Sequence, residues 1–175
     1  MAWNAAESPL LPALDGPAAS CFGADMIGAF ASGLVQSAHF SAAVKRLADS
    51  DTGLLRAGSR EPRGLYYGFR AWAAAGTLLH RTEAPPELGA YLTSDGTRFV
   101  LILVNRSEDD LVVETDMGTI PGAEGGAAEG LRVGAVGPRG RAGESTFSVL
   151  RTGRTLSWTL PRRCADALEL TTRLP

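Results

Sequence analysis

Carboxylates are the side chains of this chain that could do general acid and base chemistry, provided that two of them were held close together. Four fall in segments that the sequence predicts to be loops: Glu7, Asp15, Asp49 and Asp51. Nothing in the sequence fixes any two of them at a working distance. Helix capping and hydration therefore explain them better than catalysis, and we assign no catalytic residue.

Histidines, cysteines and glycines form no recognisable site in the sequence. His39 and His80 are far apart, and neither has a serine or cysteine partner in a nucleophile motif. Cys21 and Cys164 fall in different predicted units, which favours two small buried residues over a disulfide or a metal site. The glycine-rich stretch 134–143 leads into a predicted strand, as a hairpin loop does, whereas a phosphate-binding loop leads into a helix. We expect no metal and no cofactor.

Aromatic side chains could instead form a platform for sugar rings. The candidates are Trp3, Tyr66, Tyr67, Trp72 and Trp158. Trp72 falls on a helical apolar stripe, which favours burial, whereas the positions of Trp3 and Trp158 stay open.

The first half of the chain predicts alternating strands and helices. A strand ends near Trp3, and a helix over 16–34 follows the cap residue Asp15. A short strand over 35–42 leads to a second helix over 62–79, in whose last turn His80 would complement the helix dipole. Its apolar stripe consists of Leu65, Phe69, Trp72, Gly76 and Leu79. This order is a βαβα fragment, which normally belongs to a parallel sheet.

The second half predicts an all-β unit. Along 97–104, odd-numbered and even-numbered apolar residues alternate, so this strand is expected at the centre of a sheet with both faces covered. About six or seven short strands separated by turn residues favour an antiparallel sandwich. We therefore predict an α+β fold: a partial βα-barrel segment over 1–82, with two long helices and short strands, and an antiparallel β-sandwich over 83–175.

Charge and hydropathy are ordinary for a globular protein, with a net charge of −2, 45% hydrophobic residues and 21% charged residues. Eight arginines follow residue 130: Arg132, Arg139, Arg141, Arg151, Arg154, Arg162, Arg163 and Arg173. Arginines that alternate along strands are typical of a solvated sheet face, so we expect no nucleic-acid partner. No apolar run approaches the roughly 20 residues that span a bilayer, and no export signal opens the chain as written. We expect no membrane association and a cytoplasmic location.

Short motifs follow one another along nearly the whole chain: Ala2-Trp3-Asn4-Ala5, Asp15-Gly-Pro-Ala-Ala, Tyr66-Tyr67-Gly68-Phe69 in the second helix, the strand Phe99–Asn105, and Leu160-Pro161. In this order they resemble the carboxyl-terminal part of glycoside hydrolase family 39. More broadly, they resemble (β/α)8-barrel glycosidases that carry a β-sandwich behind the barrel. The resemblance implies that residues 1–82 correspond to the last two βα units of such a barrel.

The resemblance also implies a glutamate nucleophile immediately before the Trp-Asn pair, where this chain has Ala2. It implies an acid/base glutamate on an earlier barrel strand, to which no part of this chain corresponds. Retaining hydrolysis needs two carboxyl groups about 5 Å apart, so we expect no hydrolysis by the chain alone. The resemblance places sugar-binding residues at the ends of barrel strands, where the candidates are Trp3, Asn4, His39 and Phe40.

These observations leave three hypotheses open. The chain is a non-catalytic remnant or C-terminal fragment of a glycosidase-like protein that acts as an accessory or interaction module, or a carbohydrate-binding sandwich, or part of a truncated or split glycosidase whose missing barrel carries the chemistry. Two βα units cannot close a barrel. We therefore expect self-association or a partner chain through residues 1–45, around Phe22, Met26 and Phe30.

Overall fold

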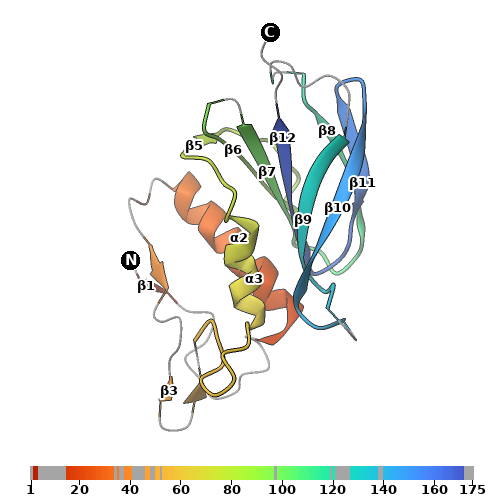
Figure 1. Ribbon diagram of the computed structural model, residues 1–175. Coiled ribbons are helices and arrows are strands. Elements are labelled where there is room, and N and C mark those ends of the chain that lie inside the picture. The colour runs from red at the N-terminus through yellow and green to blue at the C-terminus, as the bar shows by residue number, and fades with distance from the viewer. Residues whose placement is uncertain are drawn as a thin grey trace.

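One eight-stranded antiparallel sheet dominates the computed structural model of the protein. The structure describes residues 2–3, 15–33, 35, 38–40, 46–47, 50–51, 53–96, 98–118, 120, 127–137 and 140–171. Figure 1 shows the sheet curled into a half-barrel, with helices α2 (Pro17–Ser32) and α3 (Gly64–Ala71) against its outer face. The first, short strands of the chain lie on the far side of these helices from the sheet.

The order of the strands in the large sheet is β5-β6-β7-β12-β9-β10-β11-β8. Their bounds are β5 (Leu78–His80), β6 (Leu88–Ser94), β7 (Arg98–Asn105), β8 (Leu111–Asp116), β9 (Ala127–Gly134), β10 (Gly143–Thr152), β11 (Thr155–Leu160) and β12 (Cys164–Thr171). Strand β12, the last in the chain, lies in the middle, where Ala165 pairs with Val104 of β7 and Val133 of β9. Strands β5 and β8 are the two ends of the described sheet.

The sheet has a hydrophobic core on each face. On β7, Leu101 and Leu103 pack in the concave core together with Val113, Leu156 and Leu168, from three other strands. The neighbouring residues Val100, Ile102 and Val104 pack in the convex core with Ala24 and Ala71 of the helices. This alternation confirms the prediction that the strand is covered on both faces.

The two helices contact each other through small residues. A Cβ atom added at Gly68 of α3 would lie 2.7 Å from the carbonyl oxygen of Ser20 and 2.8 Å from the amide nitrogen of Ala24. The Ser20 hydroxyl donates a hydrogen bond of 2.8 Å to the carbonyl oxygen of Gly64. Glycine at 68 therefore lets the two helices approach closely, which a side chain there would prevent.

The predicted fold class is wrong. The chain does not form a helix-rich α+β fold with two long helices; it is mostly antiparallel sheet with two helices, of 16 and 8 residues, among the described residues. The first helix agrees with its prediction over 16–34 to within two residues, since it begins at Pro17 and ends at Ser32. The prediction of the second helix, over 62–79, was wrong. The division of the chain at residue 82 stays a prediction.

The predicted helix over 62–79 ends early because tertiary contacts override its apolar stripe. Helix α3 stops at Ala71, and the Gly76 N–H then binds the Thr93 hydroxyl of β6 at 3.0 Å. Residues 78–80 continue as edge strand β5, so the placement of His80 in a helical turn is also wrong. The His80 ring instead lies 2.7 Å from the Ser94 hydroxyl.

The capping role expected for Asp15 is likewise not found. Helix α2 has Gly16 as its N-cap, without a side-chain capping bond. The Asp15 carboxylate instead receives a hydrogen bond of 2.7 Å from the Arg56 guanidinium, 41 residues away. An ion pair between distant segments thus takes the place of a local cap.

Candidate functional site

The predicted carbohydrate-binding residues lie on two short strands beyond the helices. Strand β1 (Ala2–Trp3) runs parallel to β2 (His39–Phe40), with Ala2 paired to His39 and Trp3 paired to Phe40. The backbones of Trp3, His39 and Phe40 are therefore brought together, whereas Asn4 lies outside the described residues. The carbohydrate-binding role of all four residues stays a prediction.

Several carboxylates in the described part of the chain are held in ion pairs with arginines. Three aspartates that are buried or half-buried each lie 2.7 Å from a guanidinium nitrogen: Asp15 with Arg56, Asp25 with Arg106, and Asp166 with Arg132. Of the other loop carboxylates named above, Asp51 belongs to the short strand β4 (Ser50–Asp51), which pairs with β3 (Arg46–Leu47). Glu7 and Asp49 lie outside the described residues. The aspartates bound in this way hold the fold together, which is a structural role.

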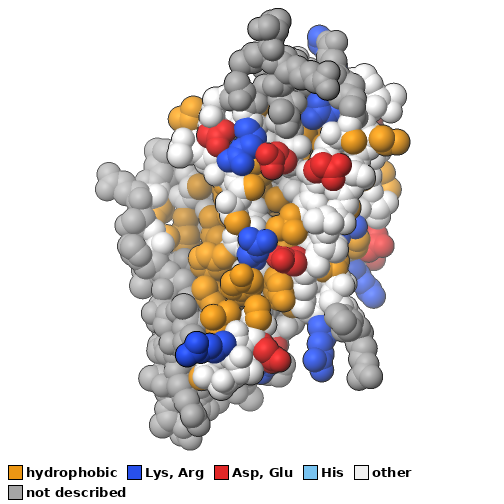
Figure 2. Space-filling model, in the orientation of Figure 1, with side chains coloured by type: hydrophobic (Ala, Val, Ile, Leu, Met, Phe, Trp, Pro, Cys, Tyr) orange, Lys and Arg blue, Asp and Glu red, His pale blue; other side chains and the backbone are white. Residues whose placement is uncertain are grey.

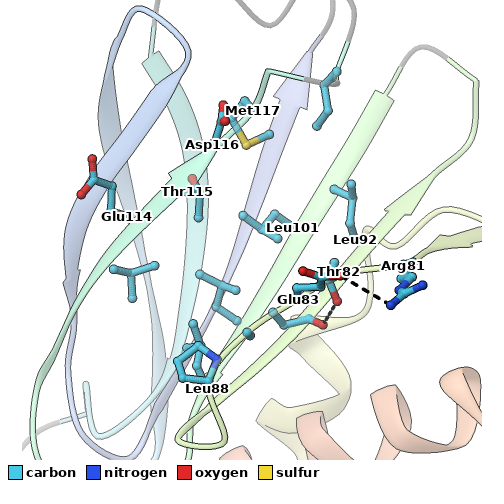
Figure 3. Close-up of a pocket in the computed structure, with 16 residues that line it drawn as sticks. Arg81, Thr82, Glu83, Leu88, Leu92, Leu101, Glu114, Thr115, Asp116 and Met117 are labelled. Atoms are coloured by element: carbon cyan, nitrogen blue, oxygen red, sulfur yellow. Dashed lines mark hydrogen bonds and ion pairs between the residues drawn. The ribbon is translucent and has the colours of Figure 1, made fainter.

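A groove of about 610 Å³ opens on the concave side of the sheet, between β8 and the strands β6 and β7. Across Figure 3 the residues Glu114, Thr115, Leu101 and Leu92 follow one another from β8 to β6. Its apolar lining consists of Ala84, Pro85, Leu88, Ala90, Leu92, Leu101, Leu103, Val113, Met117 and Ile120. Its polar lining consists of Arg81, Thr82, Glu83, Glu114, Thr115 and Asp116.

This groove does not suit the stacking of a sugar ring. Among the described residues, its lining includes aliphatic and sulfur-containing side chains but no aromatic ring. Within it, the hydroxyl of Thr115 is buried and has no hydrogen-bond partner among the described residues. A buried hydroxyl without a partner normally costs stability, so this position favours a ligand or a partner that could bond to it.

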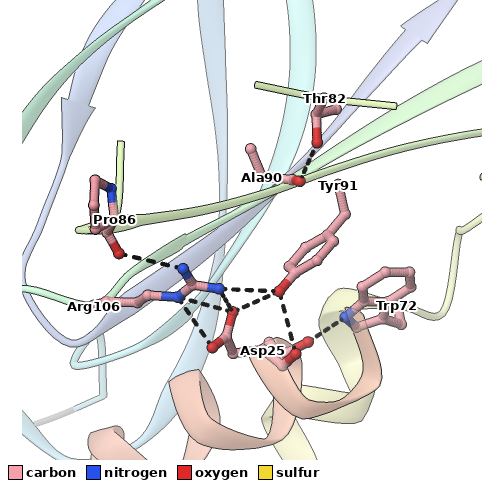
Figure 4. Close-up of polar contacts among 8 residues, drawn as sticks. Asp25, Trp72, Thr82, Pro86, Ala90, Tyr91 and Arg106 are labelled. Atoms are coloured by element: carbon pink, nitrogen blue, oxygen red, sulfur yellow. Dashed lines mark hydrogen bonds and ion pairs between the residues drawn. The ribbon is translucent and has the colours of Figure 1, made fainter. Parts of the chain in front are cut away.

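A cluster of hydrogen-bonded polar side chains joins helix α2 to the sheet (Figure 4). The Arg106 guanidinium and the Tyr91 hydroxyl each donate a hydrogen bond of 2.7 Å to the Asp25 carboxylate. Arg106 also donates to the carbonyl oxygen of Pro86 at 3.2 Å. Burial, with the Asp25 carboxylate beside it, raises the pKa of Tyr91 to about 12, so the phenol stays protonated and donates. Trp72 adds a donor bond of 2.8 Å to the carbonyl oxygen of Ala24.

A buried ion pair lies in the concave core. The Arg132 guanidinium binds both carboxylate oxygens of Asp166, at 2.8 and 2.7 Å, and Trp158 donates a third hydrogen bond at 3.0 Å. The Asp166 side chain is fully buried, and the Arg132 guanidinium lies 4.7 Å from the centre of the Phe147 ring. Burial raises the pKa of Asp166, while Arg132 acts in the opposite direction.

Sequence reasoning missed this ion pair. Arg132 was expected on a solvated sheet face, and that expectation is wrong, because its side chain is only 18% exposed. The one signal available was Asp166 itself, a carboxylate in an otherwise apolar stretch between Cys164 and Leu168. The half-buried Trp158 also belongs to this core, which favours a structural role for a residue whose position the sequence left open.

The two cysteines are free and buried, as predicted. Burial raises the pKa of Cys21 to about 12, so its thiol stays protonated and unreactive at neutral pH. Among the described residues, no group of three or more histidine, cysteine, aspartate or glutamate side chains could hold a metal ion. Within the same part of the chain, neither helix is long and apolar enough to cross a membrane.

Comparison with known proteins gives a likeness of fold. No family model and no curated protein matches the sequence. A glycoside hydrolase family 30 subfamily 8 xylanase, Xyn30A from Clostridium acetobutylicum, matches 98% of this chain and 42% of its own with a TM-score of 0.71 and 9% identity. CelM2, a bifunctional glucanase-xylanase from a metagenome library, matches 99% of this chain and 30% of its own, with a TM-score of 0.71 and 12% identity.

A third solved structure, an arabinose-bound family 51 α-L-arabinofuranosidase, matches 91% of this chain and 28% of its own, with a TM-score of 0.68 and 14% identity. The chain thus spans between 28% and 42% of the length of these three proteins. Identities this low show the fold alone, and they do not single out family 39. The fold of the chain is glycoside hydrolase-like.

Proposed function

We propose that the chain is a region of a glycoside hydrolase-like protein that acts as an accessory or interaction module and does not itself hydrolyse glycosides. The observation that carries this proposal is Ala2, which stands on β1 where the resemblance places the nucleophile. A methyl group cannot attack an anomeric carbon. The ion pairs that engage Asp15, Asp25 and Asp166 support the proposal, because they give these carboxylates a structural role. Assignment to family 39 rests on motif order alone and is part of the proposal.

Aryl glycosides of several sugars test the absence of hydrolysis directly. The purified chain is expected to release no more aryl alcohol than buffer does. Turnover that disappears when one carboxylate is replaced by its amide would contradict the proposal. Reading the coding frame upstream of Met1 tests the split-enzyme alternative, which a glutamate codon at the end of an encoded barrel strand would favour.

Carbohydrate binding is a second candidate function, because the paired backbones of β1 and β2 bring Trp3 next to Phe40. Aromatic rings at adjacent strand ends could stack on a sugar. Titration with xylan, arabinan and mixed oligosaccharides tests this, with Trp3→Ala expected to remove any binding. Leu150→Ala, at an exposed position on β10, serves as the control. No heat or fluorescence change at millimolar ligand would eliminate this candidate.

We also propose that residues 1–45 form the association surface. Helix α2 buries its small residues against α3 and the sheet, whereas Phe22 is 41% exposed. Figure 2 shows hydrophobic side chains gathered over the two helices. An apolar face of this kind favours a protein partner. Light scattering at micromolar concentration should give a mass above that of one chain; a strict monomer with protected amides over 17–32 would contradict this proposal.

A further inference from the structure

Strand β8 has one paired edge and one free edge in the described sheet. It pairs with β11 alone, in antiparallel register from Leu111–Leu160 to Asp116–Thr155. The Met117 N–H donates a hydrogen bond of 2.9 Å to the carbonyl oxygen of Arg154, on the β11 side. Because hydrogen bonding alternates along an antiparallel strand, the N–H and C=O groups of Val112, Glu114 and Asp116 point away from β11.

The opposite side of the groove does not offer an equivalent free edge. The Thr82 hydroxyl donates a hydrogen bond of 2.5 Å to the carbonyl oxygen of Ala90, so the segment 81–85 crosses the edge of β6 (Figure 4). Both 81–85 and β6 line the groove that faces β8. An incoming strand would therefore pair with β8 and lie over β6 and β7.

The floor of the groove suits one face of an extended chain. Val113 and Met117 project from β8 into the concave core, and Leu101 and Leu103 approach from β7. Side chains alternate between the two faces of a strand, so every second residue of an added strand would be buried against these four. The Thr115 hydroxyl, buried and without a partner among the described residues, lies in the same row.

The charged residues around the groove favour basic side chains on the other face of an added strand. Glu114 and Asp116 are exposed on β8. Across the groove Glu83 forms an ion pair of 3.5 Å with Arg81, the sole basic residue in the described lining. Pairing β8 with a second copy of β8 would place carboxylates opposite carboxylates, which destabilises a sheet. Lysine or arginine side chains on the incoming strand would face these acidic residues favourably.

We propose that the groove beside β8 binds an extended segment of a partner polypeptide, which adds a strand to the free edge of β8 and carries alternating apolar and basic side chains. The affinity comes from main-chain hydrogen bonds, and the specificity comes from the alternate side chains. This inference rests on the proposed role as an interaction module. Peptide binding and glycoside hydrolysis are measured separately, so either proposal can fail without the other.

The test uses the full chain and a synthetic peptide of about eight residues in which valine and lysine alternate, a typical strand length. Calorimetric titration should show saturable binding of this peptide. A matched peptide with glutamate in place of lysine should bind at least roughly fivefold more weakly, because it repeats the charge of β8. Hydrogen exchange should show slower amide exchange at Val112, Glu114 and Asp116 in the complex.

Three substitutions at Glu114 of β8 separate strand addition from charge attraction. Glu114→Pro removes an N–H that points away from β11, so it leaves the ladder with β11 intact and should weaken the lysine peptide by roughly fivefold or more. Glu114→Gln, the matched control, removes the charge but keeps the N–H and should weaken it by only about twofold. Glu114→Lys changes no backbone group and should shift preference toward the glutamate peptide, which keeps the test decisive if Glu114→Pro unfolds.

Four outcomes would overturn the proposal. The first is no binding of the lysine peptide at millimolar concentration. The second is binding that a folded Glu114→Pro variant leaves unchanged. The third is protection that appears on α2 and leaves β8 exchanging as in the free chain. Binding of both peptides with equal affinity would also contradict the charge selection proposed here.

Discussion

The two faces of the large sheet are closed in different ways. On the convex face, α2 and α3 lie so close to each other and to the sheet that several contacts permit only glycine or alanine. On the concave face, the sheet curls over leucine, valine and methionine side chains, encloses a buried ion pair and leaves a groove beside β8. The contacts between the two helices therefore have no room for additional atoms, whereas the concave face accommodates a buried ion pair and an open groove.

The largest effect should come from the ion pair of the concave face. Arg132→Met leaves the buried Asp166 carboxylate without its cation, and we expect a loss of about 3–5 kcal/mol in the free energy of unfolding at neutral pH. Urea denaturation measures this loss. The double variant Arg132→Met with Asp166→Leu removes both charges and should recover most of the stability. Equal stability of Arg132→Met and the parent chain would show that the concave core does not depend on this pair.

The pH dependence of the same variant sharpens the prediction. Burial holds the pKa of Asp166 above its ordinary value of 3.8 in the folded chain, and losing Arg132 should raise it further. A carboxyl with a raised pKa in the folded state favours folding most below its unfolded pKa, and loses that contribution as the pH rises through the folded pKa. The deficit of Arg132→Met relative to the parent chain should therefore shrink as the pH falls toward 3.8.

An intermediate effect is expected from the helix contact of the convex face. Gly68→Ala adds a methyl group 2.7 Å from the carbonyl oxygen of Ser20, a backbone atom that cannot turn aside. Overpacking of this kind costs about 1–3 kcal/mol, which a thermal melt would show as a lower Tm. Gly58→Ala is the matched control, since nothing lies within 4 Å of the added atom. Equal melting temperatures for the two variants would mean that the helices can separate freely.

The smallest effect, and one of opposite sign, is expected inside the groove. Thr115→Val replaces a buried hydroxyl that has no partner among the described residues, and should leave stability unchanged or raise it by up to about 1 kcal/mol. Thr93→Val is the contrasting control. The Thr93 hydroxyl accepts a hydrogen bond of 3.0 Å from the Gly76 N–H, so its loss should cost about 1–3 kcal/mol. A large loss at Thr115 would reveal a partner for its hydroxyl.

Local patterns in the sequence were sufficient for some elements. The alternation of apolar residues along β7 was sufficient to predict that this strand lies inside the sheet, and Pro17 was sufficient to predict the start of α2. Gly96, with a φ of +98° that favours glycine, lies in the turn between β6 and β7. In each case the residues that decide the structure are neighbours in the chain, so their pattern can be read directly.

Contacts between residues distant in the chain could not be predicted from such local patterns. The Arg132–Asp166 pair joins residues 34 apart, and the bond between Gly76 and Thr93 ends a helix that the apolar stripe would continue. The groove follows from the position of β8 at the end of the sheet order, which no local signal encodes. Of the candidate sites, the sequence indicated the strand ends at Trp3 and Phe40 and missed the groove.

The central place of β12 has a consequence for how the protein is made. Its residues pair with β7 on one side and β9 on the other, yet it leaves the ribosome after every other strand of the described sheet. Until it emerges, β5–β7 and β8–β11 have no strand between them, and both sets carry unpaired edges. Folding dominated by such long-range pairing is slow. The nascent chain therefore passes through a period in which it is open to mispairing, and a ribosome stalled before residue 164 would hold two incomplete sheets.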